Sequence, residues 1–147
     1  PFFENIVVPG GRLHVLHNQA CNLHIIDDTY NANPTSLAAA INIVASVPGE
    51  KWLVLGDMGE LGPSAAEIHH ETGLNVRNAG IDRFYTFGEL AAIAGVAYGD
   101  GAQSHRDMGE LIKVLTAEVD REVTVLVKGS RAMGMERIVE ALAGENR

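Results

Sequence analysis

Hydrophobic and polar positions follow two rhythms along this chain of 147 residues. Short runs rich in branched and aromatic residues alternate with longer segments in which apolar residues recur at helical spacing. This order is typical of a parallel β-sheet covered by helices. It predicts an α/β fold, a Rossmann-like three-layer domain with a mostly parallel sheet of about six strands flanked by helices. The predicted strands are residues 13–17, 23–28, 52–55, 83–87 and 123–127, with a weaker one at 96–98.

Capping residues predict where the helices begin. Asn33 followed by Pro34 is typical of an N-cap and the first helical position. A serine followed three residues later by an acid is typical of a capping box. Two such pairs are Ser64 with Glu67 and Ser104 with Asp107. Residues 131–142 have the spacing of a last helix, which places Met133, Ile138 and Leu142 inward.

The composition of the chain limits which classes of partner such a domain can have. With 46% hydrophobic residues, the chain suits one compact domain with a sizeable core. A net charge of -8 repels a phosphate backbone, which argues against nucleic acid as a partner. No apolar run approaches the roughly twenty residues that cross a bilayer. The single cysteine, Cys21, excludes an internal disulfide and fits the cytosol. The chain begins with Pro1 and has no signal-peptide pattern, so we expect a part of a longer polypeptide.

Three strand-to-helix junctions carry the candidate chemistry. In open parallel sheets, ligands bind beyond the carboxyl ends of the strands, where helix N-termini present free amide groups. We therefore expect these junctions to lie along one edge of the sheet. They are residues 27–34 (DDTYNANP), 56–62 (GDMGELG) and 128–131 (KGSR).

The first junction has two interpretations. A carboxylate at the end of the strand can accept hydrogen bonds from both hydroxyls of a ribose, with Tyr30 and Asn31 close to the base. Alternatively, Asp27 and Asp28 only cap a turn, and Asn33 only begins the helix. The sequence leaves both open.

The second junction lacks the G-x-G-x-x-G fingerprint of a dinucleotide site, and its acids would repel a pyrophosphate. Asp57 and Glu60 suit a cation better, either a substrate ammonium or a basic group of another domain. The alternative is a solvated acidic loop.

The third junction concentrates positive charge in an acidic protein. Lys128, the Ser130 hydroxyl and Arg131 meet at a predicted helix N-terminus, and this combination can hold a carboxylate or a phosphate. Alternatively, Ser130 is a simple N-cap and Arg131 extends over the surface. His69 and His70 are not predicted to bind a metal, because adjacent helical positions diverge, and we expect both at the surface.

Four ordered motifs resemble the Mur ligase family. They are Gly11-Arg12-Leu13, the run IDDTYNANPTS at 26–36, VLGDMGELG at 54–62 and VLVKGSR at 125–131. The resemblance spans nearly the whole chain and is to the third, C-terminal domain of the member that adds D-alanyl-D-alanine. The chain has no G-x-x-x-x-G-K-[ST] loop, so another domain must hold the triphosphate.

The resemblance implies a cytoplasmic, ATP-dependent amide ligase of peptidoglycan synthesis with three domains. Residues 1–10 would be a linker or hinge from a central ATPase domain, and residues 11–147 would form the C-terminal domain. The central domain would bind Mg²⁺, so no metal ligand is assigned to this chain. The implied partners are ATP, D-alanyl-D-alanine and UDP-N-acetylmuramoyl-tripeptide, for a monomer without nucleic-acid or membrane partners. The isolated chain is expected to be inactive.

The resemblance also implies roles for individual residues. Arg12 would reach the ATP phosphates and take part in catalysis. The other nucleotide contacts would be Asp28 at the ribose and Tyr30 and Asn31 near the adenine. The dipeptide carboxylate would be bound by Lys128, Ser130 and Arg131, and its ammonium group would be steered by Asp57 and Glu60. The alternatives are another Mur-type or folylpolyglutamate-type amino-acid ligase domain, or a non-catalytic nucleotide-binding module.

Overall fold

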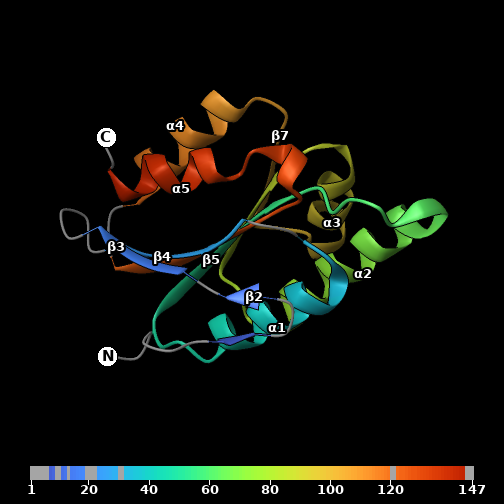
Figure 1. Cartoon of the computed structure of the whole chain (residues 1–147), viewed down its shortest axis with the longest axis horizontal. Helices are drawn as coiled ribbons and strands as arrows, with labels where there is room; N and C mark the ends of the chain where they lie inside the picture. The colour runs from blue at the N-terminus through green and yellow to red at the C-terminus, as the bar shows by residue number, and fades with distance from the viewer. Residues whose placement is uncertain are drawn as a thin grey trace.

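The computed structural model describes residues 7–8, 11–12, 14–18, 23–29, 32–119 and 122–144, of which 7–8 and 11–12 are described by their backbone alone. A six-stranded sheet runs through the centre (Figure 1). In spatial order its strands are β3 His14–Asn18, β4 Leu23–Asp28, β8 Val123–Lys128, β5 Glu50–Gly56, β6 Arg83–Phe87 and β7 Ala102–His105. All neighbouring pairs are parallel except β3 with β4. A separate two-stranded pair consists of β1 Val7–Val8 and β2 Gly11–Arg12.

Helices cover both faces of the sheet. The helices are α1 Pro34–Ala45, α2 Ala65–Asn78, α3 Glu89–Tyr98, α4 Met108–Glu118 and α5 Glu136–Ala143. One core contains buried residues of α1, α2 and α3, and the other contains those of α4 and α5 (Figure 1). Along β8, Val125 and Val127 enter the second core while Leu126 enters the first, because side chains alternate between the faces of a strand. The predicted three-layer α/β architecture is confirmed.

Both faces of the central strands are buried, which explains why these strands appear in the sequence as apolar runs. All six residues of β8 are buried, as expected for a parallel strand between two helical layers. The bounds of β4 and β6 agree with the predicted ranges 23–28 and 83–87. The predicted start of α1 is also confirmed, because Asn33 accepts a hydrogen bond from the Ser36 amide and Pro34 is the first helical residue.

The edge strand was placed wrongly. Residues 96–98 belong to α3, in which Tyr98 is buried and Val96 is 81% exposed. The strand lies at Ala102–His105, a run without large apolar residues that pairs with β6 alone. An edge strand needs less apolar surface than a central one, so its sequence lacked the signal.

The predicted start of α4 was also wrong. Ser104 lies in β7, and the N-cap of α4 is Asp107, whose carboxylate accepts a hydrogen bond from the Glu110 amide at 2.9 Å. The predicted start of α2 is confirmed, because Ser64 is its N-cap residue, but the Ser64 side chain makes no capping bond and the 3₁₀ turn Gly62–Ser64 precedes the helix. The predicted helix 131–142 is a 3₁₀ turn, Arg131–Met133, followed by α5.

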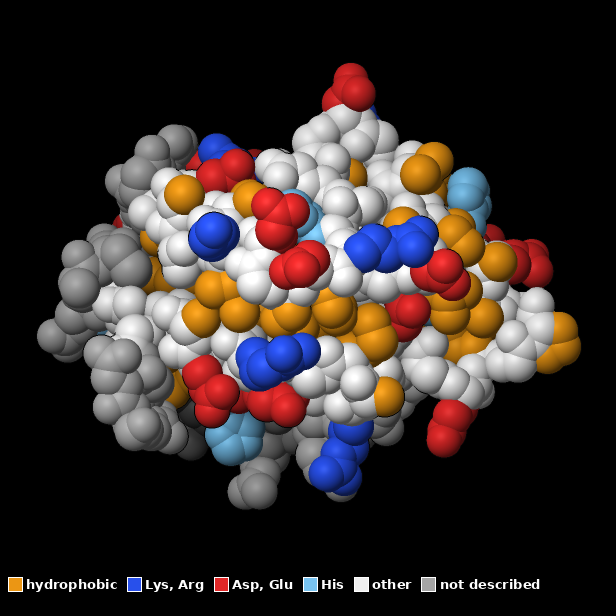
Figure 2. Space-filling view, turned by 90° about the horizontal axis from the view of Figure 1, so that it is seen from above, with side chains coloured by type: hydrophobic (Ala, Val, Ile, Leu, Met, Phe, Trp, Pro, Cys, Tyr) orange, Lys and Arg blue, Asp and Glu red, His pale blue; other side chains and the backbone are white. Residues whose placement is uncertain are grey.

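On the side of α4 and α5, Lys and Arg side chains lie beside Asp and Glu side chains (Figure 2). None of the helices in the described part of the chain is long and apolar enough to span a bilayer.

Candidate functional site at the carboxyl edge of the sheet

The three junctions lie along one edge of the sheet. Asp28 is the register partner of Lys128 between β4 and β8, and Lys128 also pairs with Leu55 of β5. Because the three strands are parallel neighbours, the loops that follow them leave the sheet on the same side. The expectation that the junctions share an edge is therefore confirmed.

Asp28 and Lys128 form an ion pair at the end of their strands. Lys128 Nζ donates to Asp28 Oδ2 at 2.6 Å, a length typical of a charge-assisted hydrogen bond. The Lys128 side chain is 1% exposed and the Asp28 side chain is 10% exposed. The two residues are 100 positions apart in the sequence, so only the order of the strands brings them together.

The acid next to Asp28 has a local structural role. Asp27 Oδ1 accepts hydrogen bonds from the Thr29 amide at 3.1 Å and from the Thr29 hydroxyl at 2.7 Å. Asp27 thus caps a turn, as one of the two sequence interpretations supposed, and Asp28 is the acid that reaches across to the neighbouring strand. Tyr30 and Asn31 lie outside the described residues, and so does the side chain of Arg12, whose backbone belongs to β2.

Asp57 makes hydrogen bonds to two other segments of the chain. Its Oδ1 accepts a hydrogen bond from the Ala91 amide in the first turn of α3 at 2.7 Å, and its carbonyl accepts one from the Ser130 amide at 3.0 Å. Gly88, at φ +114°, lies against this carboxylate, and a Cβ there would approach Oδ1 to 2.4 Å. The sequence prediction gave Asp57 no such structural role. Glu60 is exposed and has φ 59°, a conformation that is unusual for a residue other than glycine.

His69 fixes the loop that carries Asp57 and Glu60. Its Nδ1 donates to the Ala65 carbonyl at 2.7 Å, so its Nε2 accepts the hydrogen bond from the Met58 amide at 3.0 Å. The prediction that His69 lies at the surface is wrong, since it is fully buried, whereas His70 is exposed. Helical spacing could not predict that His69 binds the Met58 amide, because Met58 lies outside the helix that carries His69.

The turn after β8 packs tightly against the loop after β5. A Cβ on Gly129 would approach Met135 Cγ to 2.6 Å, and one on Gly56 would approach Met135 Sδ to 2.8 Å. The two glycines therefore allow the loops to approach each other. Ser130 is half-buried and its side chain makes no capping hydrogen bond, while Arg131 is exposed.

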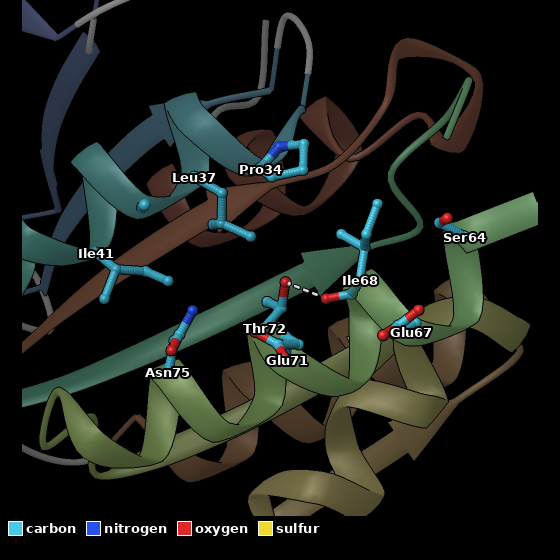
Figure 3. Close-up of a pocket in the computed structure, with 10 residues that line it drawn as sticks. Pro34, Leu37, Ile41, Ser64, Glu67, Ile68, Glu71, Thr72 and Asn75 are labelled. Carbon is cyan, nitrogen blue, oxygen red and sulfur yellow. Dashed lines mark hydrogen bonds between the residues drawn. The ribbon is translucent and has the colours of Figure 1, made fainter. Parts of the chain in front are cut away.

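A groove of about 400 Å³ lies on the face of the sheet covered by α1 and α2 (Figure 3). Leu37 and Ile41 of α1 face Ile68 of α2 across it, and Glu67 and Glu71 line the side of α2. None of the predicted site residues whose side chains the structure describes lines this groove. Within the described residues, no three histidine, cysteine, aspartate or glutamate side chains gather as a metal-binding group.

Comparison with known families accounts for the four motifs. Over residues 11–145, the chain matches the family described as Mur ligase, glutamate ligase domain. The chain belongs to the Mur ligase family. The resemblance predicted from the sequence is thus confirmed.

Several Mur ligases that are similar to this chain in sequence share the same enzyme name. The UDP-N-acetylmuramoyl-tripeptide--D-alanyl-D-alanine ligase of Escherichia coli is 40% identical over 141 residues, covering 94% of this chain and 30% of that protein. The enzyme of the same name from Bacillus subtilis is 36% identical over 148 residues, covering 95% of this chain and 32% of that protein. The chain therefore spans about a third of the length of these relatives.

Solved structures of Mur ligases also resemble this chain. The crystal structure of MurF ligase from Thermotoga maritima in complex with ADP superposes with a TM-score of 0.81 at 30% identity, covering 96% of this chain and 32% of that one. A folylpolyglutamate synthase from Mycobacterium tuberculosis, at 19% identity and a TM-score of 0.60, shares the fold alone.

Proposed function

We propose that this chain is the C-terminal domain of an ATP-dependent ligase that joins D-alanyl-D-alanine to UDP-N-acetylmuramoyl-tripeptide in peptidoglycan precursor synthesis. The observation that carries the proposal is the single sheet edge that holds the Asp28–Lys128 pair and the Ser130 turn. It occurs in a Mur ligase whose similar relatives bear that enzyme's name. We also propose that the enzyme is cytoplasmic and monomeric, and that residues 1–10 form the hinge to a preceding ATPase domain.

The proposed reaction has two steps. A carboxylate oxygen of the tripeptide bonds to the γ-phosphorus of ATP while the bond from that phosphorus to the β–γ bridging oxygen breaks, which gives an acyl phosphate and ADP. The dipeptide amine then attacks the acyl carbon, the bond from that carbon to the phosphate oxygen breaks, and the amine loses a proton. The products are the amide, ADP and phosphate. The contribution of this domain would be to position ATP and the dipeptide and to neutralise charge.

On the nucleotide side, we propose that Asp28 binds the ribose hydroxyls, with Tyr30 and Asn31 near the adenine and Arg12 at the phosphates. The 10% exposure of the Asp28 side chain at the sheet edge supports this role. Two acids of the edge already have partners, Asp28 in Lys128 and Asp57 in the Ala91 amide, and no three acids or histidines gather as a metal-binding group in the described residues. We therefore propose that the Mg²⁺ accompanying ATP is bound outside this domain.

On the dipeptide side, we propose that Ser130 and Arg131 bind the carboxylate, and that Asp57 and Glu60 steer the ammonium group. Arg131 is exposed, and a guanidinium matches a carboxylate through paired hydrogen bonds. Glu60 is exposed as well. Asp57 would act through its charge, because its Oδ1 is already bonded to the Ala91 amide. Lys128 was predicted to share the carboxylate, and its contact with Asp28 motivates the further inference below.

The test uses a fusion enzyme in which the full 147-residue chain replaces the matching C-terminal domain of the Escherichia coli ligase. We expect ADP release that depends on both D-alanyl-D-alanine and the UDP-N-acetylmuramoyl-tripeptide. Arg12→Ala should abolish this release. Arg106→Ala should not, because Arg106 is exposed and follows β7, three strands away from β8.

A panel of amines separates the proposal from its alternatives. Glutamate or another amino acid supporting faster ADP release than D-alanyl-D-alanine would assign the domain to a different ligase. Tight ATP binding by the isolated chain, combined with no dipeptide-dependent turnover in the fusion enzyme, would favour a non-catalytic nucleotide module. Normal turnover of the Arg12→Ala enzyme would remove Arg12 from the proposed site.

A further inference from the structure

Lys128 is the more deeply buried member of its ion pair. It ends a strand whose six residues are all buried, and its side chain is 1% exposed. Asp28, which it contacts at 2.6 Å, retains 10% exposure of its side chain. Of the two charged groups, the carboxylate is therefore the one that a ligand reaches from outside.

This arrangement bears on what Lys128 can bind. Because the Lys128 side chain is 1% exposed, its ammonium would have to move outward to meet the carboxylate of a ligand, and the partly buried Asp28 carboxylate would then lose its charged partner. Such a loss is strongly unfavourable for buried ion pairs. Ser130 and Arg131, two and three positions further along, are half-buried and exposed, so both present surface to solvent.

We infer that Lys128 is a positioning residue, which orients the Asp28 carboxylate for a nucleotide ribose and does not contact the dipeptide. The inference rests on the proposed function, in which Asp28 binds the ribose. An ionised carboxylate offers about four acceptor positions, and the Lys128 ammonium is bonded to Oδ2. The register pairing of Asp28 with Lys128 holds both backbones, so the bond fixes the carboxylate relative to the sheet edge.

The experiment measures nucleotide and dipeptide recognition separately in the fusion enzyme. The nucleotide arm compares KM for ATP with KM for 2′-deoxy-ATP and 3′-deoxy-ATP. The dipeptide arm compares KM for D-alanyl-D-alanine with KM for its C-terminal amide, which lacks the carboxylate charge. The variants are Lys128→Met and Arg131→Ala, with Lys113→Met as a control at an exposed lysine of α4.

For Lys128→Met we expect KM for ATP to rise about tenfold or more, the effect of losing a well-placed hydrogen bond to a charged group. KM for the deoxynucleotide that lacks the recognised hydroxyl should change little, so the discrimination between the nucleotides collapses. A merely structural role would not produce this selective collapse. KM for the dipeptide should stay within about twofold, whereas Arg131→Ala should raise it and reduce the preference over the amide.

The opposite pattern would overturn the inference. If Lys128→Met raised KM for the dipeptide, lost the preference over the amide and kept nucleotide discrimination, Lys128 would be a dipeptide ligand. Should Lys128→Met fail to fold, the double variant Asp28→Asn/Lys128→Met removes both charges. An unchanged dipeptide KM in that variant supports the inference, and a raised one refutes it. Absence of dipeptide-dependent turnover in the unaltered fusion enzyme would instead refute the proposed function itself.

Discussion

Replacing Lys128 with methionine should destabilise the chain more than any other lysine substitution tested beside it. The change keeps much of the side-chain volume and removes the ammonium that contacts Asp28 at 2.6 Å. With side chains only 1% and 10% exposed, water replaces the lost partner poorly. Breaking a buried pair in this way costs about 3–5 kcal/mol. For a domain of this size, that corresponds to a fall in Tm of about 6–20 °C.

The double variant separates the ion pair from the volume change. In Asp28→Asn/Lys128→Met no buried charge is left without a partner, so we expect most of the lost stability to return. Because each single variant leaves the other charge without a partner, the coupling energy from the double-mutant cycle should be about 3 kcal/mol or more. Lys113→Met, on the exposed surface of α4, should stay within about 0.5 kcal/mol of the unaltered chain.

Urea unfolding at neutral pH measures these differences. Trp52 is the only tryptophan and is fully buried in β5, next to β8, so its fluorescence reports the sheet directly. Far-UV circular dichroism tests whether the helices unfold in the same transition. A Lys128→Met chain that lost less than about 1 kcal/mol would refute the reasoning. So would a loss that vanished at high salt, because screening acts mainly on exposed charges.

Three further predictions concern residues around the site. Gly88→Ala should lower the urea midpoint more than Gly49→Ala does, because both glycines have positive φ but only a Cβ at position 88 would collide with Asp57. His69→Leu should cost about 1–3 kcal/mol and speed hydrogen exchange at the Met58 amide, since that buried N–H loses its acceptor. Burial, reinforced by a hydrogen bond to Glu118, raises the pKa of the Tyr85 phenol well above its usual range. Its proton is held more tightly in the folded chain, so the associated stability is present below about pH 10 and is lost as the pH rises further, and Tyr85→Phe should flatten that decline.

Each of these has a result that would contradict it. Equal losses for Gly88→Ala and Gly49→Ala would mean that the contact with Asp57 is relieved without cost. Unchanged exchange at Met58 in the His69→Leu chain would mean that another group accepts that amide. If Tyr85 ionised near pH 10 in the folded chain, as followed by its ultraviolet absorbance, the effect of its burial would be refuted.

Local patterns predicted the parts of the fold that local physics controls. The central strands β4, β6 and β8 are apolar because both of their faces are buried, so their positions follow from the sequence. The N-cap at Asn33 is a bond between residues three positions apart. The edge strand β7 carried no apolar signal, because none of its residues is buried. The residues 96–98 were misassigned because a short apolar run fits a strand and a buried helix equally well.

The candidate site divides in the same way. The sequence by itself identified the family and the three junctions, because consecutive motifs carry that information. It left open which acid caps a turn, and it missed that His69 holds the Met58 amide and that Asp57 binds the Ala91 amide. Only the tertiary structure decided that Lys128 faces Asp28. The two residues are 100 positions apart, and the insertion of β8 between β4 and β5 sets that contact, which no local spacing encodes.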